Sequence, residues 1–321
     1  MTAVALPPVP LPTTVAGGDN RAELARAIAS WVDSPAMTAL LREFRYGPLP
    51  DAPLGDRLAA LEKISAERWD YRAGNLERHE AVGERFDPAA DARIRSAAGA
   101  LGLADRSTPA GRRYDHVLVL GGGVRTMMAR AHLAATILRS GVGAGSVTGL
   151  GSLRLLHDQN DLARQFGLGE CVTEGDAVDE ALRHVFDSPP RADQRIGRTT
   201  TGEPWWIRSY PETQPPLHVL AAPSSRPGER ANTADTLIGW AELTGQAPAG
   251  ARLLLVTTDI FVPFQHCDAV RILGLGYGCG VETVGFANLT DRWVQPAETF
   301  AILQEVRSAI RSMRALHQAL T

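Results

Sequence analysis

The feature that most constrains the fold is an apolar run that ends in three glycines and continues into a helical pattern. Residues 117–120 are apolar, residues 121–123 are all glycine, and apolar side chains then recur at helical spacing over residues 127–138. A buried parallel strand, a tight turn and a helix produce this order. Glycines let a ligand approach the backbone, and free amides at a helix N-terminus favour an anion. We therefore expect a nucleotide-like or phosphate-bearing ligand at this turn.

The glycine turn does not complete a dinucleotide-binding fingerprint. Thr126 stands where the third glycine of that motif should be, and residues 146–152, around the next expected strand, contain no acidic residue. The pattern therefore argues against a NAD site of the usual kind. A turn that only connects a strand to a helix explains the same glycines, since such turns are often glycine-rich without a ligand. Both explanations stay open at this point.

Strands and helices alternate from about residue 112 to the end of the chain. The expected strands cover residues 116–120, 145–149, 217–222, 252–258 and 281–286, and the expected helices cover residues 125–139, 158–167, 175–186, 232–244, 264–273 and 296–319. Alternation of this kind gives a mostly parallel sheet that helices cover on both faces. We predict an α/β sandwich with a mostly parallel sheet over residues 112–321.

Three further segments complete the expected domain organisation. Residues 1–18 are rich in proline and are expected to be disordered. Residues 19–106 show helical spacing and are expected to form a helical region that packs on the α/β domain. Residues 187–216 carry six prolines and interrupt the alternation, so we expect an irregular insertion there, either a lid or binding loop or a cover for a sheet edge.

Composition excludes several classes of function. The net charge of -3 gives no electrostatic reason to expect nucleic acid, and no apolar run approaches the length of a membrane span. The three cysteines, Cys171, Cys267 and Cys279, are an odd number without paired spacing, so we expect no disulfide framework and no metal site. The proline-rich beginning lacks the basic segment of a signal peptide. We expect a cytoplasmic protein whose partner is a small molecule, in an oligomeric state that the sequence does not indicate.

Candidate site residues follow the expected strands, because open α/β sheets bind ligands beyond the carboxyl ends of their strands. The candidate ligand-binding residues are Gly121, Gly122, Gly123, Arg125, Thr148, Gly149, Asn232, Thr233, Thr257 and Thr258. Asp259 is a candidate acid or base, since a carboxylate at a strand end can transfer a proton, and His266 is the second catalytic candidate. Asn232 followed by Asp235 also matches a helix capping box, which needs no ligand.

Short blocks within residues 115–290 resemble the DUF218 family, also called YdcF-like. Residues 119–123 with Arg130 and Ala134 match its first block, and Thr148 with Gly149 matches its second. Residues 231–236 and 256–264 resemble its last two blocks. The resemblance implies a Rossmann-like three-layer fold and adds Arg130 to the ligand-binding residues. The family includes members that bind S-adenosylmethionine, which makes this molecule a candidate cofactor.

The chain departs from that family pattern at two positions. Phe261 and Phe264 stand where the family usually has His and Arg. The first hypothesis is a cytoplasmic small-molecule-binding protein, or an enzyme, that acts on a nucleotide-like ligand. An alternative is a hydrolase or transferase of a phosphorylated or glycosylated metabolite, with Asp259 as acid or base. The two phenylalanines favour a third possibility, a non-catalytic interaction protein on the same scaffold.

Overall fold

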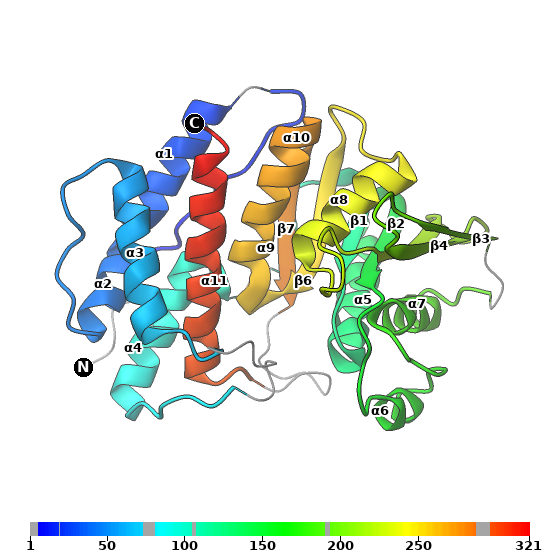
Figure 1. Cartoon of the computed structure of the whole chain (residues 1–321), viewed down its shortest axis with the longest axis horizontal. Helices are drawn as coiled ribbons and strands as arrows, with labels where there is room; N and C mark the ends of the chain where they lie inside the picture. The colour runs from blue at the N-terminus through cyan, green and yellow to red at the C-terminus, as the bar shows by residue number, and fades with distance from the viewer. Residues whose placement is uncertain (1–5, 19, 73–80, 105–106, 190–192, 287–295) are drawn as a thin grey trace.

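A seven-stranded sheet forms the centre of the molecule (Figure 1). The computed structural model describes residues 6–18, 20–72, 81–104, 107–189, 193–286 and 296–321. The strands are β1 (Arg113–Leu120), β2 (Gly143–Ser152), β3 (Asp193–Arg198), β4 (Pro204–Tyr210), β5 (Leu217–Ala222), β6 (Arg252–Thr258) and β7 (Gly280–Phe286). Their order is β3-β4-β5-β2-β1-β6-β7, and only β3 and β4 run antiparallel to their neighbours. The predicted α/β class with a mostly parallel sheet is confirmed.

Helices cover both faces of this sheet. They are α1 (Arg21–Val32), α2 (Pro35–Glu43), α3 (Leu54–Arg68), α4 (Pro88–Ala98), α5 (Val124–Arg139), α6 (Asn160–Gln165), α7 (Glu174–Val185), α8 (Thr233–Thr244), α9 (Val262–Ala269), α10 (Leu275–Tyr277) and α11 (Thr299–Gln318), with short helical segments η1 (Gly99–Leu103), η2 (Asp259–Phe261) and η3 (Val270–Gly274). The helices α5 and α7 pack on one face, and α8 and α9 pack on the other. Among the described residues, no helix combines the length and the hydropathy needed to cross a bilayer.

The five parallel strands lie where strands were predicted, because β1, β5, β6 and β7 are rich in the apolar residues that burial requires; β2, which contains four glycines, is longer than predicted. The segment expected to be irregular, residues 187–216, differs: it contains β3 and β4. Its prolines flank the strands or, as Pro204 does, begin one, where a missing N–H is tolerated. Within β4, Trp206 and Tyr210 join the hydrophobic cluster on the α7 side, while Ile207 joins the cluster on the opposite side.

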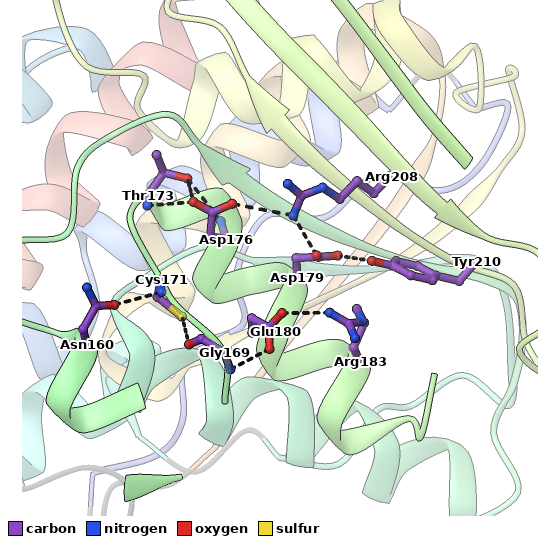
Figure 2. A network of polar contacts seen from close by, with 10 residues as sticks. All are labelled: Asn160, Gly169, Cys171, Thr173, Asp176, Asp179, Glu180, Arg183, Arg208 and Tyr210. Atoms are coloured by element: carbon purple, nitrogen blue, oxygen red, sulfur yellow. Dashed lines mark hydrogen bonds and ion pairs between the residues drawn. The ribbon is translucent and has the colours of Figure 1, made fainter. Parts of the chain in front are cut away.

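A polar network fixes β4 to α7 (Figure 2). The buried carboxylate of Asp179 accepts hydrogen bonds from the Tyr210 hydroxyl at 2.6 Å and from the Arg208 guanidinium at 2.8 Å. Arg208 also lies over the Trp206 ring, at 4.1 Å from its centroid. Burial raises the pKa of Asp179, and these two hydrogen bonds act in the opposite direction. The antiparallel strand is thus held against the parallel part of the sheet by more than its ladder of backbone bonds.

The helices α1 to α4 lie beyond the β7 side of the sheet, next to α11 (Figure 1). Apolar residues of these helices, such as Ile28, Leu61 and Ile94, belong to the same hydrophobic cluster as Val306 and Ile310 of α11. The helical region and the α8–α9 face of the sheet therefore share one continuous core.

Residues 12–17, which we call the edge strap, run along β7, the last strand of the sheet. The hydroxyl groups of Thr13 and Thr14 donate to the carbonyl oxygens of Val281 and Cys279, and the Gly17 amide donates to that of Gly278. This differs from the disorder expected for residues 1–18, of which the structure describes 6–18. The prolines there alternate with apolar side chains that can be buried, and the exposed edge of a sheet offers unpaired backbone groups to bind.

Candidate functional site

A cleft of about 870 Å³ opens at the carboxyl ends of β2 and β5. The residues that line it are Leu153, Arg154, Leu155, Leu156, His157, Asp158, Gln159, Glu203, Pro204, Ala222, Pro223, Ser224, Gly228, Glu229, Arg230 and Ala231. Because β4 is antiparallel to β5, its first residue, Pro204, reaches the same edge of the sheet. This is the edge at which open α/β sheets bind ligands, and the volume is within the usual range for small-molecule sites.

The outer wall of the cleft is the loop that leads from β5 to α8. The Ser224 hydroxyl donates to the Arg226 carbonyl and accepts from the Arg226 amide, which forms a tight turn at one end of the loop. At the other end, Asn232 and Asp235 form a capping box on α8. The Gly228 amide donates to the Glu203 carboxylate at 3.4 Å. Both ends of the wall are therefore fixed by local hydrogen bonds, and its middle contacts the start of β4.

A carboxylate positions one cation of the cleft. Ser152 donates to Glu174 at 2.6 Å, and Arg154 pairs with the same carboxylate at 3.3 Å. The Glu174 side chain is 13% exposed and that of Arg154 is 27% exposed, so the pair is largely shielded from water. A positioned guanidinium that is partly exposed at a cleft suits an oxyanion of a ligand, because charge-assisted hydrogen bonds to oxyanions are strong.

Gln159 connects the cleft to the glycine turn. Its side-chain oxygen accepts a hydrogen bond at 2.8 Å from the Val124 amide, the first amide of α5. The Gln159 side chain also packs so closely on Gly123 that a Cβ there would meet it at 2.8 Å. The glycine turn therefore lies at the inner end of the cleft, separated from it by one amide side chain.

The three glycines of the turn are explained first by packing. A Cβ on Gly121 would lie 2.5 Å from the Leu150 carbonyl oxygen, and a Cβ on Gly122 would lie 3.1 Å from Thr126. None of the three has a positive φ. Close approach of β2, α5 and Gln159 is thus sufficient to require glycine here, and whether the backbone also contacts a ligand stays a prediction.

Arg130 lies buried between the ends of β1 and β6. Its guanidinium donates to the carbonyl oxygens of Leu120, at 2.7 Å, and of Gly121, and to the hydroxyl of Thr258 at 3.2 Å. The ring of Phe261 lies 5.7 Å from the guanidinium carbon. Arg130 therefore joins the two strands on the α5 side of the sheet. It does not line the cleft.

The other predicted ligand-binding residues fall into separate environments. Thr257 and Thr233 are joined through Gln265, on the side of the sheet covered by α8 and α9. Thr258 points to the opposite side, toward Arg130, as the alternation of a strand requires. Asn232 accepts hydrogen bonds from the Ala234 and Asp235 amides. These predicted site residues therefore lie on both faces of the sheet and do not form one group.

Thr148 and Gly149 lie inside the sheet and not at its edge. The expected strand ends at residue 149, but β2 continues to Ser152, so both residues sit in mid-strand. Thr148 is fully buried, and a Cβ on Gly149 would lie 2.3 Å from Val178 of α7. Glycine is needed at 149 because a helix packs directly on the strand. The bound ligand predicted at these two residues has no access to them.

Neither predicted catalytic residue lines the cleft. Asp259 is buried at the start of η2, where its carboxylate accepts from the Ile260 amide. His266 lies over β7, with one ring nitrogen 3.0 Å from the Thr283 hydroxyl and the other 2.8 Å from the Pro12 carbonyl oxygen. Arg125 lies beside the Phe166 ring, near α6. In this geometry His266 holds the edge strap, and its two nitrogens are engaged in doing so.

The residues that build the cleft were largely missed by the sequence interpretation. Arg154 and Gln159 lie in the segment after β2, and Glu174 begins α7. The end of β2, predicted three residues too early, concealed their position. Glu203 was hidden because the segment around it was expected to be irregular. No cluster of three or more potential metal-ligating side chains occurs within the part of the chain that the structure describes.

Comparison with known proteins identifies relatives over nearly the whole chain. Residues 15–102 match the Rv3785 N-terminal domain family. The uncharacterized proteins Rv3785 of Mycobacterium tuberculosis and Mb3814 of Mycobacterium bovis are each 33% identical to this chain, over 98% of its length and 96% of theirs. No solved structure matches the chain.

The resemblance to the DUF218 family is therefore wrong, since the family match and the relatives are of the Rv3785 type. The short blocks that carried it have local explanations. Glycines occur after β1 because neighbouring elements approach closely, and Asn232 occurs because it caps α8. Any parallel strand followed by a helix favours such residues, so they do not distinguish one α/β family from another.

Proposed function

We propose that this chain, which belongs to the family of the mycobacterial protein Rv3785, binds a small phosphate-bearing metabolite. The ligand occupies the cleft at the carboxyl ends of β2 and β5. The observation that carries the proposal is the cleft itself, with Arg154 positioned at its inner end by Glu174.

Three physical features support this function. The cleft lies where the geometry of a parallel sheet leaves a crevice. Arg154 and Arg230 supply cations to its lining, and Glu203 and Asp158 supply acceptors for hydroxyl or amino groups. The N-terminus of α5 lies directly behind Gln159, and a helix N-terminus favours negative charge nearby. Nucleotides and sugar phosphates both combine an anionic group with hydroxyls, so they are the two classes to test.

Binding is better supported than catalysis. The residues predicted to transfer protons, Asp259 and His266, are bonded within the protein away from the cleft lining. The proposal therefore stands as a binding function, and the hydrolase or transferase alternative gains no support from these two side chains.

A thermal-shift screen tests the proposal. Adenosine nucleotides, S-adenosylmethionine and sugar phosphates are added separately to the full chain. A ligand present at 100 times its dissociation constant adds about 2.7 kcal/mol to the free energy of unfolding, which raises the melting temperature measurably. A shift with any phosphorylated probe supports the function. Absence of a shift with all of them at millimolar concentration contradicts it.

A pair of variants locates the binding. In Ala231→Trp, a large ring replaces a half-buried side chain of the cleft lining, so the ligand-induced shift should disappear. Ala66→Trp makes the same change at an exposed position of α3 and should keep the shift. Equal shifts in both variants would place the ligand elsewhere.

A further inference from the structure

We propose that the cleft selects an elongated ligand with opposite chemistry at its two ends: an oxyanion at Arg154 and a hydrogen-bond donor, an amino group above all, at Glu203. This inference rests on the proposed function, since it assumes that the cleft is the binding site, and it adds the orientation and the class of the ligand.

The strand register sets the distance between the two ends. Ser152 of β2 pairs with Ala222 of β5, and Ala221 pairs with Trp206 of β4. Continuing these ladders beyond the sheet edge brings the backbone at Arg154 and at Glu203 to the same level, about 10 Å apart, with the chain that follows β5 between them. The Arg154 guanidinium is held at Glu174 and the Glu203 carboxylate at the Gly228 amide. We therefore expect a ligand that meets both groups to be longer than a single phosphate or a small carboxylate.

The two ends differ in charge. At the β2 end, Arg154 is paired with Glu174, which in turn accepts from Ser152, so the guanidinium is fixed in place. At the β4 end, Glu203 accepts the Gly228 amide at 3.4 Å. A carboxylate accepts hydrogen bonds and cannot donate them when ionised, so this end favours donor groups over carbonyl oxygens.

The middle of the cleft is apolar. Ala222 and Pro223 form the floor at the end of β5, and Pro204 lies beside them. Leu155, whose side chain is 56% exposed, lines the same cleft from the segment after β2. Small and apolar residues between two polar ends suit a flat, weakly polar group such as a heterocyclic ring. An oxyanion, a ring and an exocyclic amino group in that order describe an amino-substituted nucleoside phosphate.

Adenosine monophosphate and purine riboside 5′-monophosphate are the probes for this orientation. They have nearly the same size, and the second lacks the amino group of the first without gaining another donor. By isothermal titration, the wild-type chain should bind adenosine monophosphate at least tenfold more tightly, since only its amino group can donate to the Glu203 carboxylate. In Glu203→Gln the acceptor is uncharged and its hydrogen bond is weaker, so the ratio should fall below threefold.

Two further variants serve as controls. Glu23→Gln makes the same chemical change outside the cleft lining, at an exposed residue of α1 paired with Arg26, and should keep the wild-type ratio. Arg154→Gln should weaken both monophosphates at least tenfold, keep their ratio, and leave adenosine unaffected. Circular dichroism and melting temperature show that each variant is folded.

The outcomes separate the two proposals. If neither monophosphate nor ribose 5-phosphate binds, the phosphate-binding function fails and the orientation fails with it. If phosphates bind but the two monophosphates bind equally, or the ratio survives in Glu203→Gln, the orientation is overturned while the binding function stands. Loss of discrimination in Glu203→Gln but not in Glu23→Gln is the expected result.

Discussion

Several glycines of this chain lie where two elements meet. The distance from an added Cβ to the nearest atom shows how strictly glycine is required at each position. At Gly121 the nearest obstacle to a Cβ is a backbone oxygen, that of Leu150 at 2.5 Å. At Gly122 the nearest obstacles are Cγ2 and Cβ of Thr126, at 3.1 and 3.2 Å, so the neighbour needs to move by only a few tenths of an ångström. The Leu150 carbonyl is closer, and it cannot move away without disturbing the β1–β2 ladder. Two adjacent glycines of one turn therefore have different tolerances.

We expect Gly121→Ala to lower the free energy of unfolding by about 1–3 kcal/mol, the usual cost of overpacking. Gly122→Ala should cost less than half as much, because Thr126 can yield. Urea unfolding of the two variants, followed by circular dichroism, measures both. Equal losses would show that the turn is constrained by something other than the Leu150 carbonyl.

At the scale of single elements, a polar row crosses the sheet beneath α8. His116 of β1 lies 2.9 Å from the Ser146 hydroxyl, and His218 of β5 lies 2.9 Å from the Ser209 hydroxyl. The Trp240 ring of α8 meets His116 edge-on, at 5.4 Å between centroids. Burial lowers the pKa of both histidines, while Asp115 acts in the opposite direction on His116. The surroundings of both histidines therefore favour the neutral form of the imidazole.

This row predicts a loss of stability in mild acid. The pKa of each histidine is lower in the folded chain than in the unfolded chain, where it is about 6.5. The unfolded chain therefore takes up more protons as the pH falls below about 7, and the stabilisation present at higher pH is lost, by at most about 1.4 kcal/mol per pH unit for each histidine.

Unfolding by urea between pH 8 and pH 5 tests the row. The double variant His116→Gln, His218→Gln keeps hydrogen-bonding side chains but cannot titrate, so its stability should fall less steeply than that of the wild type over this range. Parallel pH curves for the two proteins would refute the assignment to these histidines.

The elements also show how far a sequence can be interpreted. The positions of the five parallel strands were predictable, since apolar residues are concentrated in buried strands such as β1 and β6. The end of β2 was not, because Gly149 and Gly151 resemble a turn when in fact α7 packs on them. The strand β4 was concealed by its flanking prolines, and with it Glu203 and the outer end of the cleft. The pattern of strands and helices predicts at which edge of the sheet a ligand can bind. The contacts between elements, which the sequence does not show, determine which residues lie at that edge.

On the scale of the whole molecule, the helical region and the C-terminal helix form one structure. The buried Leu58 and Leu61 of α3 share a hydrophobic cluster with Met313 and Leu316 of α11, and Trp31 donates from its indole to the Leu101 carbonyl at 3.0 Å. Apolar surface of this kind is stabilising only while it is covered. The division of the chain into residues 19–106 and 112–321 stays a prediction. Separating the two parts would expose the shared hydrophobic cluster to water and so lower the free energy of unfolding.

A chain that starts at Arg112 should aggregate or melt at a markedly lower temperature than the full chain, because the apolar side of α11 becomes exposed. Co-expression with residues 1–106 as a separate chain should restore the melting temperature in part. Differential scanning calorimetry measures both. A truncated chain that melts like the full chain would mean that the helical region is an independent module.

The edge strap sets an order of events during synthesis. Thr14 binds the carbonyl of Cys279, 265 residues later in the chain, and the ring of His266 holds the Pro12 carbonyl across 254 residues. Side-chain room for Thr14 exists because residue 274 is glycine, where a Cβ would lie 2.6 Å from the threonine hydroxyl. While a ribosome makes the chain, residues 12–17 emerge long before the groove that receives them, and contacts this distant in sequence form late. The edge strap therefore stays unpaired until β7 has been translated, and its binding to β7 is one of the last steps of folding.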